Sequence, residues 1–272
     1  MSSSAYERFR ALHERPRAFV MPNAWDGASA ALLARAGFEA LGSTSLGLAF
    51  SLGRQDGLHA VSRDEAIAHA ALLARVSGLP VNGDLEDGFG ADPQDCAATV
   101  NAAVEAGLAG LGIEDTTADP DRPIHDFDDA VARIRAAAGA ARGRIVLTGR
   151  TDNYLHGRTD LDDTIRRLSA FAEAGADVLY APGLPTMESI VSVVRAVAPK
   201  PVNVLIGPAR PVRLEELEAA GVRRVSVGGA LYRRAMTALN ETALALRDGD
   251  LSAATGAIGG SEIAGMLPRD EP

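Results

Sequence analysis

The chain has 272 residues, of which 47% are hydrophobic and 23% charged, close to the average of globular proteins and unlike disordered or fibrous ones. Acidic residues outnumber basic ones 36 to 27, so the net charge of −9 gives no electrostatic reason to bind nucleic acid or an anionic membrane. The longest uncharged stretch has 14 residues, the polar N-terminus lacks a signal-peptide core, and the single Cys96 excludes intrachain disulfides, so we expect a cytoplasmic protein that spans no membrane.

Short apolar, β-branched runs alternate with stretches of helical periodicity along the whole chain. The predicted strands are Ala18–Pro22, Ala40–Ser43, Pro80–Asp84, Gly110–Glu114, Arg144–Arg150, Asp177–Pro182, Pro201–Ile206 and Arg224–Gly228. The predicted helices are Ala24–Ala36, Ser62–Ser77, Pro93–Ala106, Phe127–Ala138, Leu161–Ala174, Thr186–Val197, Leu214–Ala220 and Ala230–Arg247. Ser62 and Asp92 stand where N-caps are expected, and glycines such as Gly78 and Gly175 stand where helices end.

Eight strand–helix units in about 250 residues are typical of a (β/α)₈ TIM barrel. A doubly wound open sheet is the structural alternative, but no G-x-G-x-x-G follows the first predicted strand. No linker-like segment marks a domain boundary. The sequence therefore predicts one domain over residues 1–272, with a barrel at about 17–247 and a helical tail at 248–272.

Acidic residues gather where predicted strands end, which is the face that carries the active site in such barrels. Asp84 and Glu86 are two residues apart, so in an extended strand end they point to the same side. Glu114 ends the neighbouring strand, and Asp56 lies in the loop after the second strand. Carboxylates that converge in this way repel one another unless a cation neutralises them. Oxygen ligands without nearby His or Cys predict a hard ion, Mg²⁺ or Mn²⁺.

Other strand ends provide polar groups for a substrate. Arg150 ends the fifth strand and can hold an anion through its planar guanidinium. Ser43 and Thr44 end the second strand, and Asn203 lies in the seventh. Lysine chemistry has a single candidate, because Lys200 is the only lysine in the chain.

At these residues the chain resembles the isocitrate lyase/phosphoenolpyruvate mutase superfamily. The resemblance covers nearly the whole barrel and is carried by segments at its strand ends, which are Pro22–Asp26, Gly42–Ser45, Gly53–Asp56, Gly83–Gly90, Gly112–Asp115, Gly149–Asp152 and Ser226–Gly228. It implies a TIM barrel and an Mg²⁺ enzyme that makes or breaks a C–C or P–C bond next to an α-oxycarboxylate, through a pyruvate-like enolate.

The resemblance also implies a role for each candidate residue. Asp84 would bind the metal directly, and Asp56, Glu86 and Glu114 would hold metal-bound waters. Arg150 would contact the substrate's carboxylate or enolate oxygen, and we assign catalysis to Arg150 and Glu114. The Ser43 hydroxyl and the backbone N–H groups of Ser43 and Thr44 would cradle the carboxylate, and Asn203 would face the substrate.

The segment after the fourth strand departs from the lyase pattern. Thr116–His125 is short and lacks the Lys-Cys-Gly-His type loop of isocitrate and methylisocitrate lyases, and Pro182 stands where lyases have Glu. The leading hypothesis is therefore a lyase or decarboxylase of a small 2-oxo acid such as oxaloacetate. Its proton source stays open among a metal-bound water and side chains at four positions, Tyr154, Asp115, His125 and His156.

Two other classes of function stay open. One is a P–C bond enzyme, either a phosphonopyruvate hydrolase or a phosphoenolpyruvate mutase. The other is a 2-oxo acid-binding protein without full catalysis. The resemblance further implies a homo-oligomer, a tetramer or dimer of dimers, in which the tail around Ala253–Ala264 supplies a helix exchanged between subunits.

Overall fold

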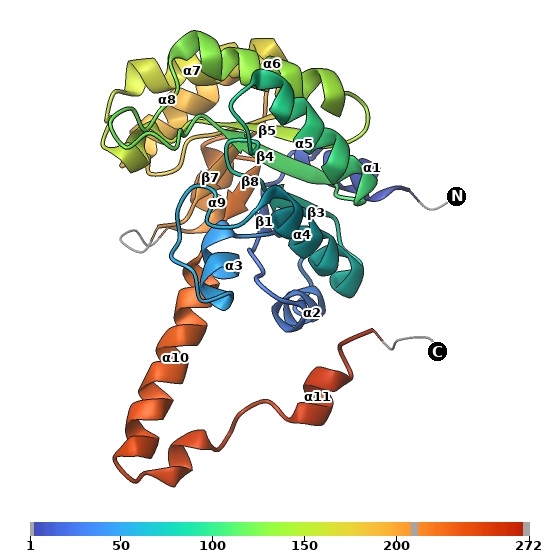
Figure 1. The fold of residues 1–272 in the computed structure, drawn as a ribbon, viewed down its shortest axis with the longest axis vertical. Helices are drawn as coiled ribbons and strands as arrows, with labels where there is room; N and C mark the ends of the chain where they lie inside the picture. Colours follow the sequence, from blue (N-terminus) through green and yellow to red (C-terminus); the bar gives the residue numbers. More distant parts are fainter. Residues whose placement is uncertain (1–2, 208–211, 269–272) are drawn as a thin grey trace.

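The computed structural model describes residues 3–207 and 212–268, and its centre is a barrel of eight parallel strands (Figure 1). Their bounds are β1 Phe19–Met21, β2 Leu41–Gly42, β3 Val81–Asp84, β4 Gly110–Glu114, β5 Val146–Arg150, β6 Val178–Tyr180, β7 Val202–Leu205 and β8 Arg224–Ser226. Each strand lies within its predicted range, so the predicted TIM barrel is confirmed.

The barrel closes between its first two strands through a short contact. The hydrogen-bonded order runs β1-β8-β7-β6-β5-β4-β3-β2, and a parallel bridge pairs Asn23 with Gly42 across the remaining gap. Gly42 N–H donates to Pro22 O at 2.9 Å, and Ala24 N–H donates to Gly42 O at 2.9 Å. A Cβ at residue 42 would lie 2.7 Å from Asn23 Nδ2, so this closure requires glycine.

The helices cover the outside of the barrel. Their bounds are α1 Ala5–Glu14, α2 Gly27–Arg35, α3 Ser45–Ser51, α4 Arg63–Ser77, α5 Pro93–Glu105, α6 Phe127–Ala141, α7 Leu161–Ala174, α8 Met187–Val197, α9 Leu214–Ala219, α10 Ala230–Arg247 and α11 Gly260–Ala264, with 3₁₀ turns η1 Asn153–His156 and η2 Leu251–Ala254. The predicted caps are confirmed, since Ser62 and Asp92 cap α4 and α5, and Gly78 and Gly175 end α4 and α7 with positive φ. The helices α1 and α3 lie outside the predicted set.

The main hydrophobic core lies between the strands and the surrounding helices. Outward-facing Leu111, Ile113 and Leu147 are completely buried, and they belong to the same cluster as Ile134 and Phe171 on the helices. Since alternate strand residues point outward, the intervening residues point into the barrel, where a cavity opens at one end.

The helix α1 closes the amino end of the barrel. Phe9 and Leu12 are buried in a second cluster with Phe19, Val146 and other residues near the strand starts. The mostly polar composition of residues 1–17 hid this amphipathic helix, whose N-cap Ser4 and Glu7 form a capping box.

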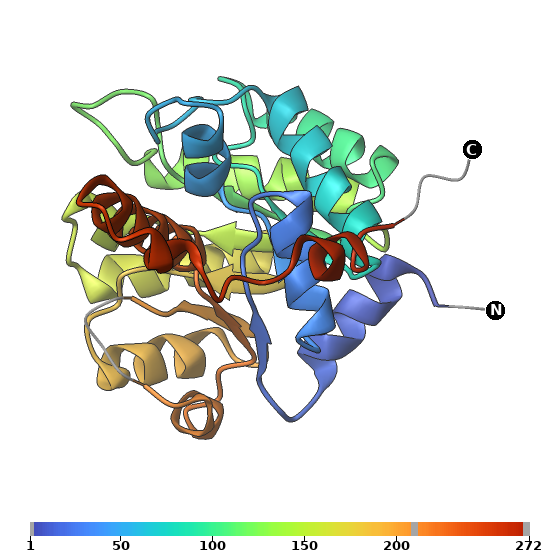
Figure 2. The same ribbon diagram turned by 90° about the horizontal axis from the view of Figure 1, so that it is seen from below.

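The helix α10 leaves the barrel instead of packing along it (Figures 1 and 2). Within α10 only Tyr232 is buried, where its ring meets Trp25 and Phe50. The chain then turns back, and Glu262 of α11 pairs with Arg35 of α2 at 2.9 Å. The last four residues of the predicted tail, 269–272, lie outside the described residues. No helix in the described ranges has the length and apolarity needed to cross a membrane.

Candidate active site

A cavity of about 170 Å³ opens at the carboxyl ends of the strands, where the sequence predicts the site. Side chains from all eight strands or the loops that follow them line it. The polar ones are Asn23, Ser43, Thr44, Ser45, Asn82, Asp84, Glu114, Thr148, Arg150, Tyr180, Asn203, Arg224 and Ser226. The structure therefore brings together six of the predicted residues, which are Ser43, Thr44, Asp84, Glu114, Arg150 and Asn203.

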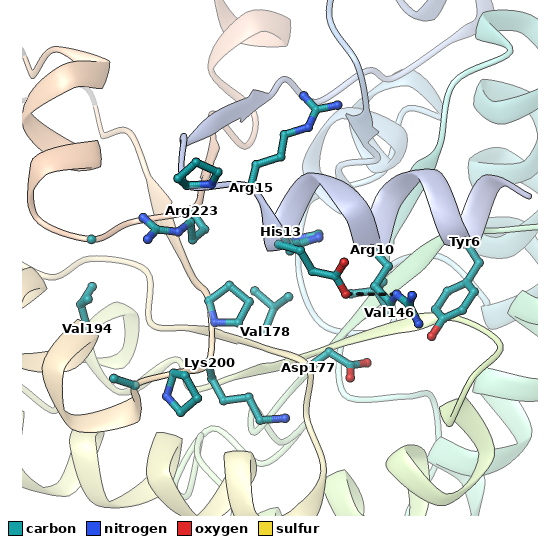
Figure 3. A pocket seen from close by; sticks show the side chains of 16 residues that line it. Tyr6, Arg10, His13, Arg15, Val146, Asp177, Val178, Val194, Lys200 and Arg223 are labelled. Carbon is teal, nitrogen blue, oxygen red and sulfur yellow. Dashed lines mark ion pairs between the residues drawn. The ribbon is translucent and has the colours of Figure 1, made fainter. Parts of the chain in front are cut away.

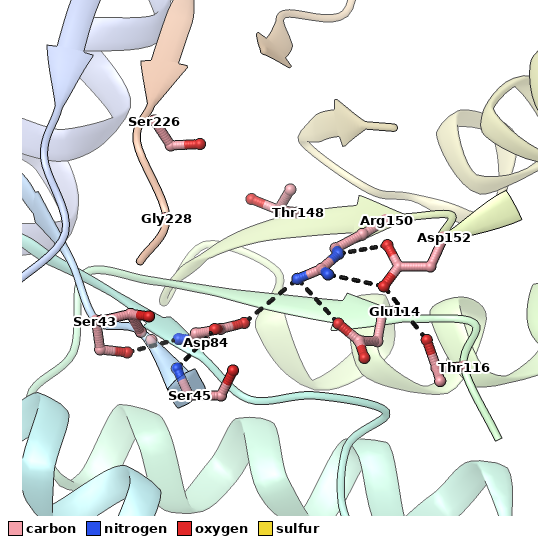
Figure 4. A network of polar contacts seen from close by, with 12 residues as sticks. Ser43, Ser45, Asp84, Glu114, Thr116, Thr148, Arg150, Asp152, Ser226 and Gly228 are labelled. Atoms are coloured by element: carbon pink, nitrogen blue, oxygen red, sulfur yellow. Dashed lines mark hydrogen bonds and ion pairs between the residues drawn. The ribbon is translucent and has the colours of Figure 1, made fainter. Parts of the chain in front are cut away.

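Arg150 is the centre of the charged network (Figure 4). Asp152 accepts two hydrogen bonds from it, at 2.6 Å from Nε and 2.7 Å from Nη2. The Nη1 atom lies 2.9 Å from Glu114 and 3.5 Å from Asp84. Arg150 thus supplies part of the positive charge that the carboxylates need. Asp152 holds the guanidinium in a fixed plane, a role that was not predicted from the sequence.

Burial and like charges shape the titration of this network. Burial, together with Asp152 and Asp84, raises the pKa of Glu114 above its usual range, and Arg150 opposes that shift. Burial opposes the charge of Arg150, but Asp152, Glu114 and Asp84 keep the pKa of the guanidinium above its usual value. Arg150 therefore stays charged, and burial favours the protonated form of Glu114.

The segment Ser43–Ser45, which follows β2, forms hydrogen bonds with Asp84, whereas the prediction was that it would cradle a substrate carboxylate. Ser43 N–H donates to Asn82 O at 3.0 Å, so this N–H is used by the sheet and is not free to cradle a carboxylate. The Ser43 hydroxyl accepts a hydrogen bond from Asp84 N–H at 2.8 Å. Ser45 N–H donates to Asp84 Oδ2 at 3.0 Å, and the Thr44 hydroxyl caps the start of α3. This segment therefore orients Asp84.

Glu86 lies near Asp84 for a reason other than strand alternation. The strand β3 ends at Asp84, and Glu86 has a positive φ of 49°, so the expectation of two side chains on one face of an extended strand was wrong. Glu86 Oε2 accepts a hydrogen bond from His59 N–H at 2.5 Å, whereas Glu86 Oε1 is buried without a partner. Burial is the largest cause that raises the pKa of Glu86 to about 7, and Asp84 adds to it.

Asp56 lies on an exposed loop beside this group. Partial burial and the charge of Asp84 raise its pKa, while Arg150 lowers it. Neither Asp56 nor Glu86 lines the cavity itself. Both stand within electrostatic reach of Asp84, at the rim of the site.

The donor set fits a hard cation, although the side chains do not surround one. Within residues 3–207 and 212–268, no group of three or more His, Cys, Asp or Glu side chains is arranged as a metal site. Asp84 and Glu114 instead face Arg150. The predicted ligands nevertheless provide only carboxylate oxygens, and the buried, unpartnered Oε1 of Glu86 is the kind of atom that a cation or its water satisfies.

A second polar group lies deeper in the barrel. Arg224 of β8 is buried, and its Nε donates to Asn203 Oδ1 at 3.0 Å. Its Nη2 donates to Thr148 Oγ1 at 2.9 Å. Asn203 Nδ2 in turn donates to Ser226 Oγ at 2.9 Å. Sequence reasoning missed Arg224. The alternation of Arg224, Val225 and Ser226 was the available signal, because it places both polar residues on the inward face.

Two acidic neighbours of the predicted site residues support the loops that carry the site. Asp87 is buried beside His59 at 2.8 Å and Arg133 at 3.5 Å, and Arg133 also donates to carbonyls of the loop after β3. Asp115 is buried against Arg167 at 3.1 Å and accepts a hydrogen bond from Asp152 N–H. Asp87 therefore helps to fix the loop that carries Glu86, and Asp115 helps to fix Asp152.

The larger cavity lies at the amino end of the barrel, beside α1 (Figure 3). Its volume is about 730 Å³, and its lining includes Arg10, Glu14, Asp177, Lys200 and Arg223. The only lysine of the chain is therefore at the end of the barrel opposite Asp84 and Glu114. This position removes it as a candidate for chemistry in the smaller cavity.

The fold is a TIM barrel with a charged cavity at the carboxyl ends of its strands, and comparison with known proteins identifies its family. Residues 9–247 match the family described as phosphoenolpyruvate phosphomutase. The chain belongs to that family, and thus to the phosphoenolpyruvate mutase/isocitrate lyase superfamily, as the resemblance predicts. It is an enzyme of the carbon–carbon lyase type, whose substrate the comparisons leave open.

Three similar proteins illustrate the range of the superfamily. The structure of a lyase/mutase-like protein from Burkholderia cenocepacia is 50% identical, with a TM-score of 0.91 and coverage of 96% of this chain and 94% of the other. Oxaloacetate decarboxylase from Paraburkholderia xenovorans is 32% identical over 258 residues, which cover 90% of this chain and 83% of that protein. A structure of oxaloacetate acetylhydrolase with oxalate is 28% identical, with a TM-score of 0.89 and coverage of 97% and 93%.

Proposed function

We propose that this protein is an Mg²⁺- or Mn²⁺-dependent lyase or decarboxylase that acts on a C–C bond next to an α-oxycarboxylate. The substrate class is a small 2-oxo diacid such as oxaloacetate, and the reaction passes through a pyruvate-like enolate. The observation that carries the proposal is the arrangement of Arg150 with Asp84 and Glu114 at the mouth of the barrel. The similarity to an oxaloacetate decarboxylase and an oxaloacetate acetylhydrolase supports this substrate class.

Four carboxylates would hold the cation. We assign direct binding to Asp84, whose backbone and carboxylate are fixed by Ser43 and Ser45. Asp56, Glu86 and Glu114 would hold its water ligands, with Glu86 Oε1 as the unpartnered oxygen. When bound, the divalent cation stabilises negative charge that develops on the substrate's oxygens.

Arg150 then binds the substrate. Its Nε and Nη2 groups are clamped by Asp152, so the guanidinium keeps its plane when the carboxylates on the other side change partners. If Asp84 bound the cation and Glu114 one of its water ligands, the Nη1–H groups of Arg150 would be released from these carboxylates and could donate to the substrate's carboxylate or enolate oxygen. Charge-assisted hydrogen bonds of this kind are about twice as strong as neutral ones.

The remaining roles go to the cavity walls and to the proton source. We assign substrate contacts to the Ser43 hydroxyl, to Thr44 and to Asn203, all of which line the cavity. In the described part of the chain, the lining of this cavity includes none of the side chains predicted as proton donors, which are Tyr154, Asp115, His125 and His156. Glu114 lines the cavity and burial raises its pKa, so we assign the proton source to this carboxyl group.

Turnover of oxaloacetate with Mg²⁺ tests the proposal. We expect release of pyruvate, or of oxalate and acetate if the enzyme is hydrolytic, and complete loss of turnover after exhaustive chelation. Full activity in the chelated protein would contradict the metal assignment. Absence of turnover on a panel of 2-oxo diacids, with tight binding retained, would support a 2-oxo acid-binding protein instead.

P–C bond chemistry is the second candidate, because the matching family is described as phosphoenolpyruvate phosphomutase. The same cation and Arg150 can stabilise the enolate that P–C cleavage produces. Phosphate release from phosphonopyruvate, or its conversion into phosphoenolpyruvate, separates this reaction from C–C cleavage. Either product at a rate above that of oxaloacetate turnover would favour the second candidate.

We also propose a homo-oligomer, a tetramer or dimer of dimers, built through the tail that follows the barrel. Exposed apolar side chains concentrate on α10 and the tail, at Met236, Leu239, Leu244, Leu246, Leu251, Ile258 and Leu267. A second copy would cover them if α11 docked on the partner's barrel instead of its own. Sedimentation should show an oligomer that Leu239→Arg dissociates, while Leu155→Arg, at an exposed leucine on η1, leaves it intact. A wild-type monomer at micromolar concentration would contradict this proposal.

A further inference from the structure

Arg224 is a buried cation without an acidic partner. Its side chain lies inside the barrel and is 1% exposed. Among residues 3–207 and 212–268 it forms no ion pair, and its three polar partners are the neutral side chains of Asn203, Thr148 and His13. Burial lowers its pKa to about 9. Burying a charge in this way costs stability, so packing alone does not explain an arginine at this place.

His13 of α1 is the partner of Arg224 on the side of the guanidinium that faces away from the site cavity. His13 Nδ1 lies 2.9 Å from Phe9 O, which can only accept, so Nδ1 carries the hydrogen and Nε2 is left as an acceptor. Arg224 Nη1 lies 3.4 Å from His13 Nε2. The guanidinium is thereby held between α1 below and the site cavity above.

Arg224 determines which hydrogen-bonding groups face the cavity. Because Asn203 Oδ1 accepts from Arg224 Nε, the amide cannot flip without placing its NH₂ against a donor. Asn203 Nδ2 therefore points to Ser226, with its second hydrogen free of that bond. Thr148 Oγ1 likewise accepts from Arg224, so its own hydrogen remains to be donated. Asn and Thr can normally donate or accept, but here each accepts from Arg224 and keeps a hydrogen that it can donate into the cavity.

We infer that Arg224 is a positioning residue that makes the part of the cavity floor formed with Asn203 and Thr148 a hydrogen-donating, positively charged surface for an oxyanion of the substrate. All three residues, Arg224, Asn203 and Thr148, line the same cavity as Asp84 and Arg150. A carboxylate has only acceptor atoms and a negative charge and matches this floor, whereas a methyl group has neither. The site thus selects a diacid, with one carboxylate near Arg150 and the second at the floor.

This inference rests on the proposed function, because it assumes that the substrate enters this cavity. Its test uses binding and not turnover. Malate and 2-hydroxybutyrate have four carbons each and differ by a carboxylate in place of a methyl group. Calorimetry with Mg²⁺ present would measure both dissociation constants for the wild type, Arg224→Met and Thr148→Val, with Arg223→Met as the matched control.

The wild type and Arg223→Met should bind malate about tenfold or more tightly than 2-hydroxybutyrate, which is the scale of one charge-assisted hydrogen bond. Arg224→Met should lose this preference while 2-hydroxybutyrate binding changes by less than about threefold. Its melting temperature should stay level or rise, because an unpaired buried charge is removed. Thr148→Val removes one floor donor with little change in shape, and should lose part of the preference even if Arg224→Met fails to fold.

Equal weakening of both ligands in the variants would make Arg224 a purely structural residue and overturn the inference. An unchanged malate preference, or no preference in the wild type, would overturn it as well. Loss of the preference in a protein that turns over no 2-oxo diacid would leave the inference standing and remove the proposed function. Turnover of oxaloacetate, together with an unchanged malate preference in the variants, would support the proposed function and overturn the inference.

Discussion

The two ends of the barrel carry cavities of opposite character. The cavity at the amino end, about 730 Å³, is more than four times as large as the one of about 170 Å³ at the carboxyl end. Its charged side chains come from α1 and the loops before strands, and Arg10 and Glu14 of α1 pair with each other at 3.2 Å. At the carboxyl end, three carboxylates, those of Asp84, Glu114 and Asp152, meet in one network around Arg150.

The difference shows that convergence, and not volume, identifies the site. Parallel strands bring their carboxyl ends to one place, so charged residues there must share a small space and perturb one another. At the amino end, α1 fills the barrel with Phe9 and Leu12. Substitutions at that end should therefore change stability, and those at the carboxyl end should change chemistry.

The largest expected effect on stability comes from Phe9→Ala. Phe9 is completely buried, and its ring packs so closely on Gly110 that a Cβ there would lie 2.5 Å away. Its loss should lower the free energy of unfolding by about 3–5 kcal/mol, measured by urea denaturation. The kcat/KM of the folded enzyme should stay within about twofold. Leu155→Ala, at an exposed position, serves as the control, and a parallel loss of kcat/KM would break the division between the two ends.

Asp84→Asn should have the opposite profile. It removes the charge that we assign to cation binding but keeps the shape of the side chain, so kcat/KM should fall by about 10²–10³-fold with the melting temperature nearly unchanged. Glu14→Gln makes the same kind of change in the amino-end cavity and should leave the rate within about twofold. A fully active Asp84→Asn enzyme would refute the assignment.

Arg150→Lys tests whether the planar guanidinium matters. Lysine cannot hold both oxygens of Asp152 and reach Glu114, so oxalate, a mimic of the pyruvate enolate, should bind about 1.5–3 kcal/mol more weakly. Calorimetry with and without Mg²⁺ measures this, and the wild type should bind oxalate only with the metal. Arg10→Lys at the other end is the control. Equal oxalate affinity in wild type and Arg150→Lys would show that the anion binds elsewhere.

The smallest effect is a pH dependence that originates at Glu86. Its pKa is raised to about 7 in the folded state, above the value of 4.5 for a free side chain. Between these values the folded state keeps a proton that the unfolded state has released, so the metal-free protein should lose stability as pH rises through this range. Thermal unfolding across this range should show the slope, and Glu86→Gln should flatten it. Stabilisation by Mg²⁺ should grow as pH rises through 7, because ionised Glu86 is the form that assists cation binding.

Particular residues show how far sequence reasoning could go towards the site. Asp84, Glu114 and Arg150 were placed correctly because each ends a strand and strand ends converge. Glu86 was placed near Asp84 for the wrong reason, since a left-handed residue ends the extended geometry on which the spacing argument depends. Asp152 and Arg224 received no role. Asp152 lies two residues after Arg150 and has no sequence feature that sets it apart from other loop carboxylates. Arg224 is one of two adjacent arginines in an arginine-rich chain.

By itself the sequence determined the strand–helix alternation, the capping residues and the barrel, because these depend on local periodicity and on residues close together in the chain. Only the tertiary structure decided that α1 fills the amino end, that α10 leaves the barrel, and that Arg224 lies under Asn203 and Thr148. Those arrangements join residues as far apart as His13 and Arg224, whose contact at 3.4 Å has no trace in the sequence near either of them. Local patterns fix which face of an element is apolar, whereas packing across the barrel decides what that face meets.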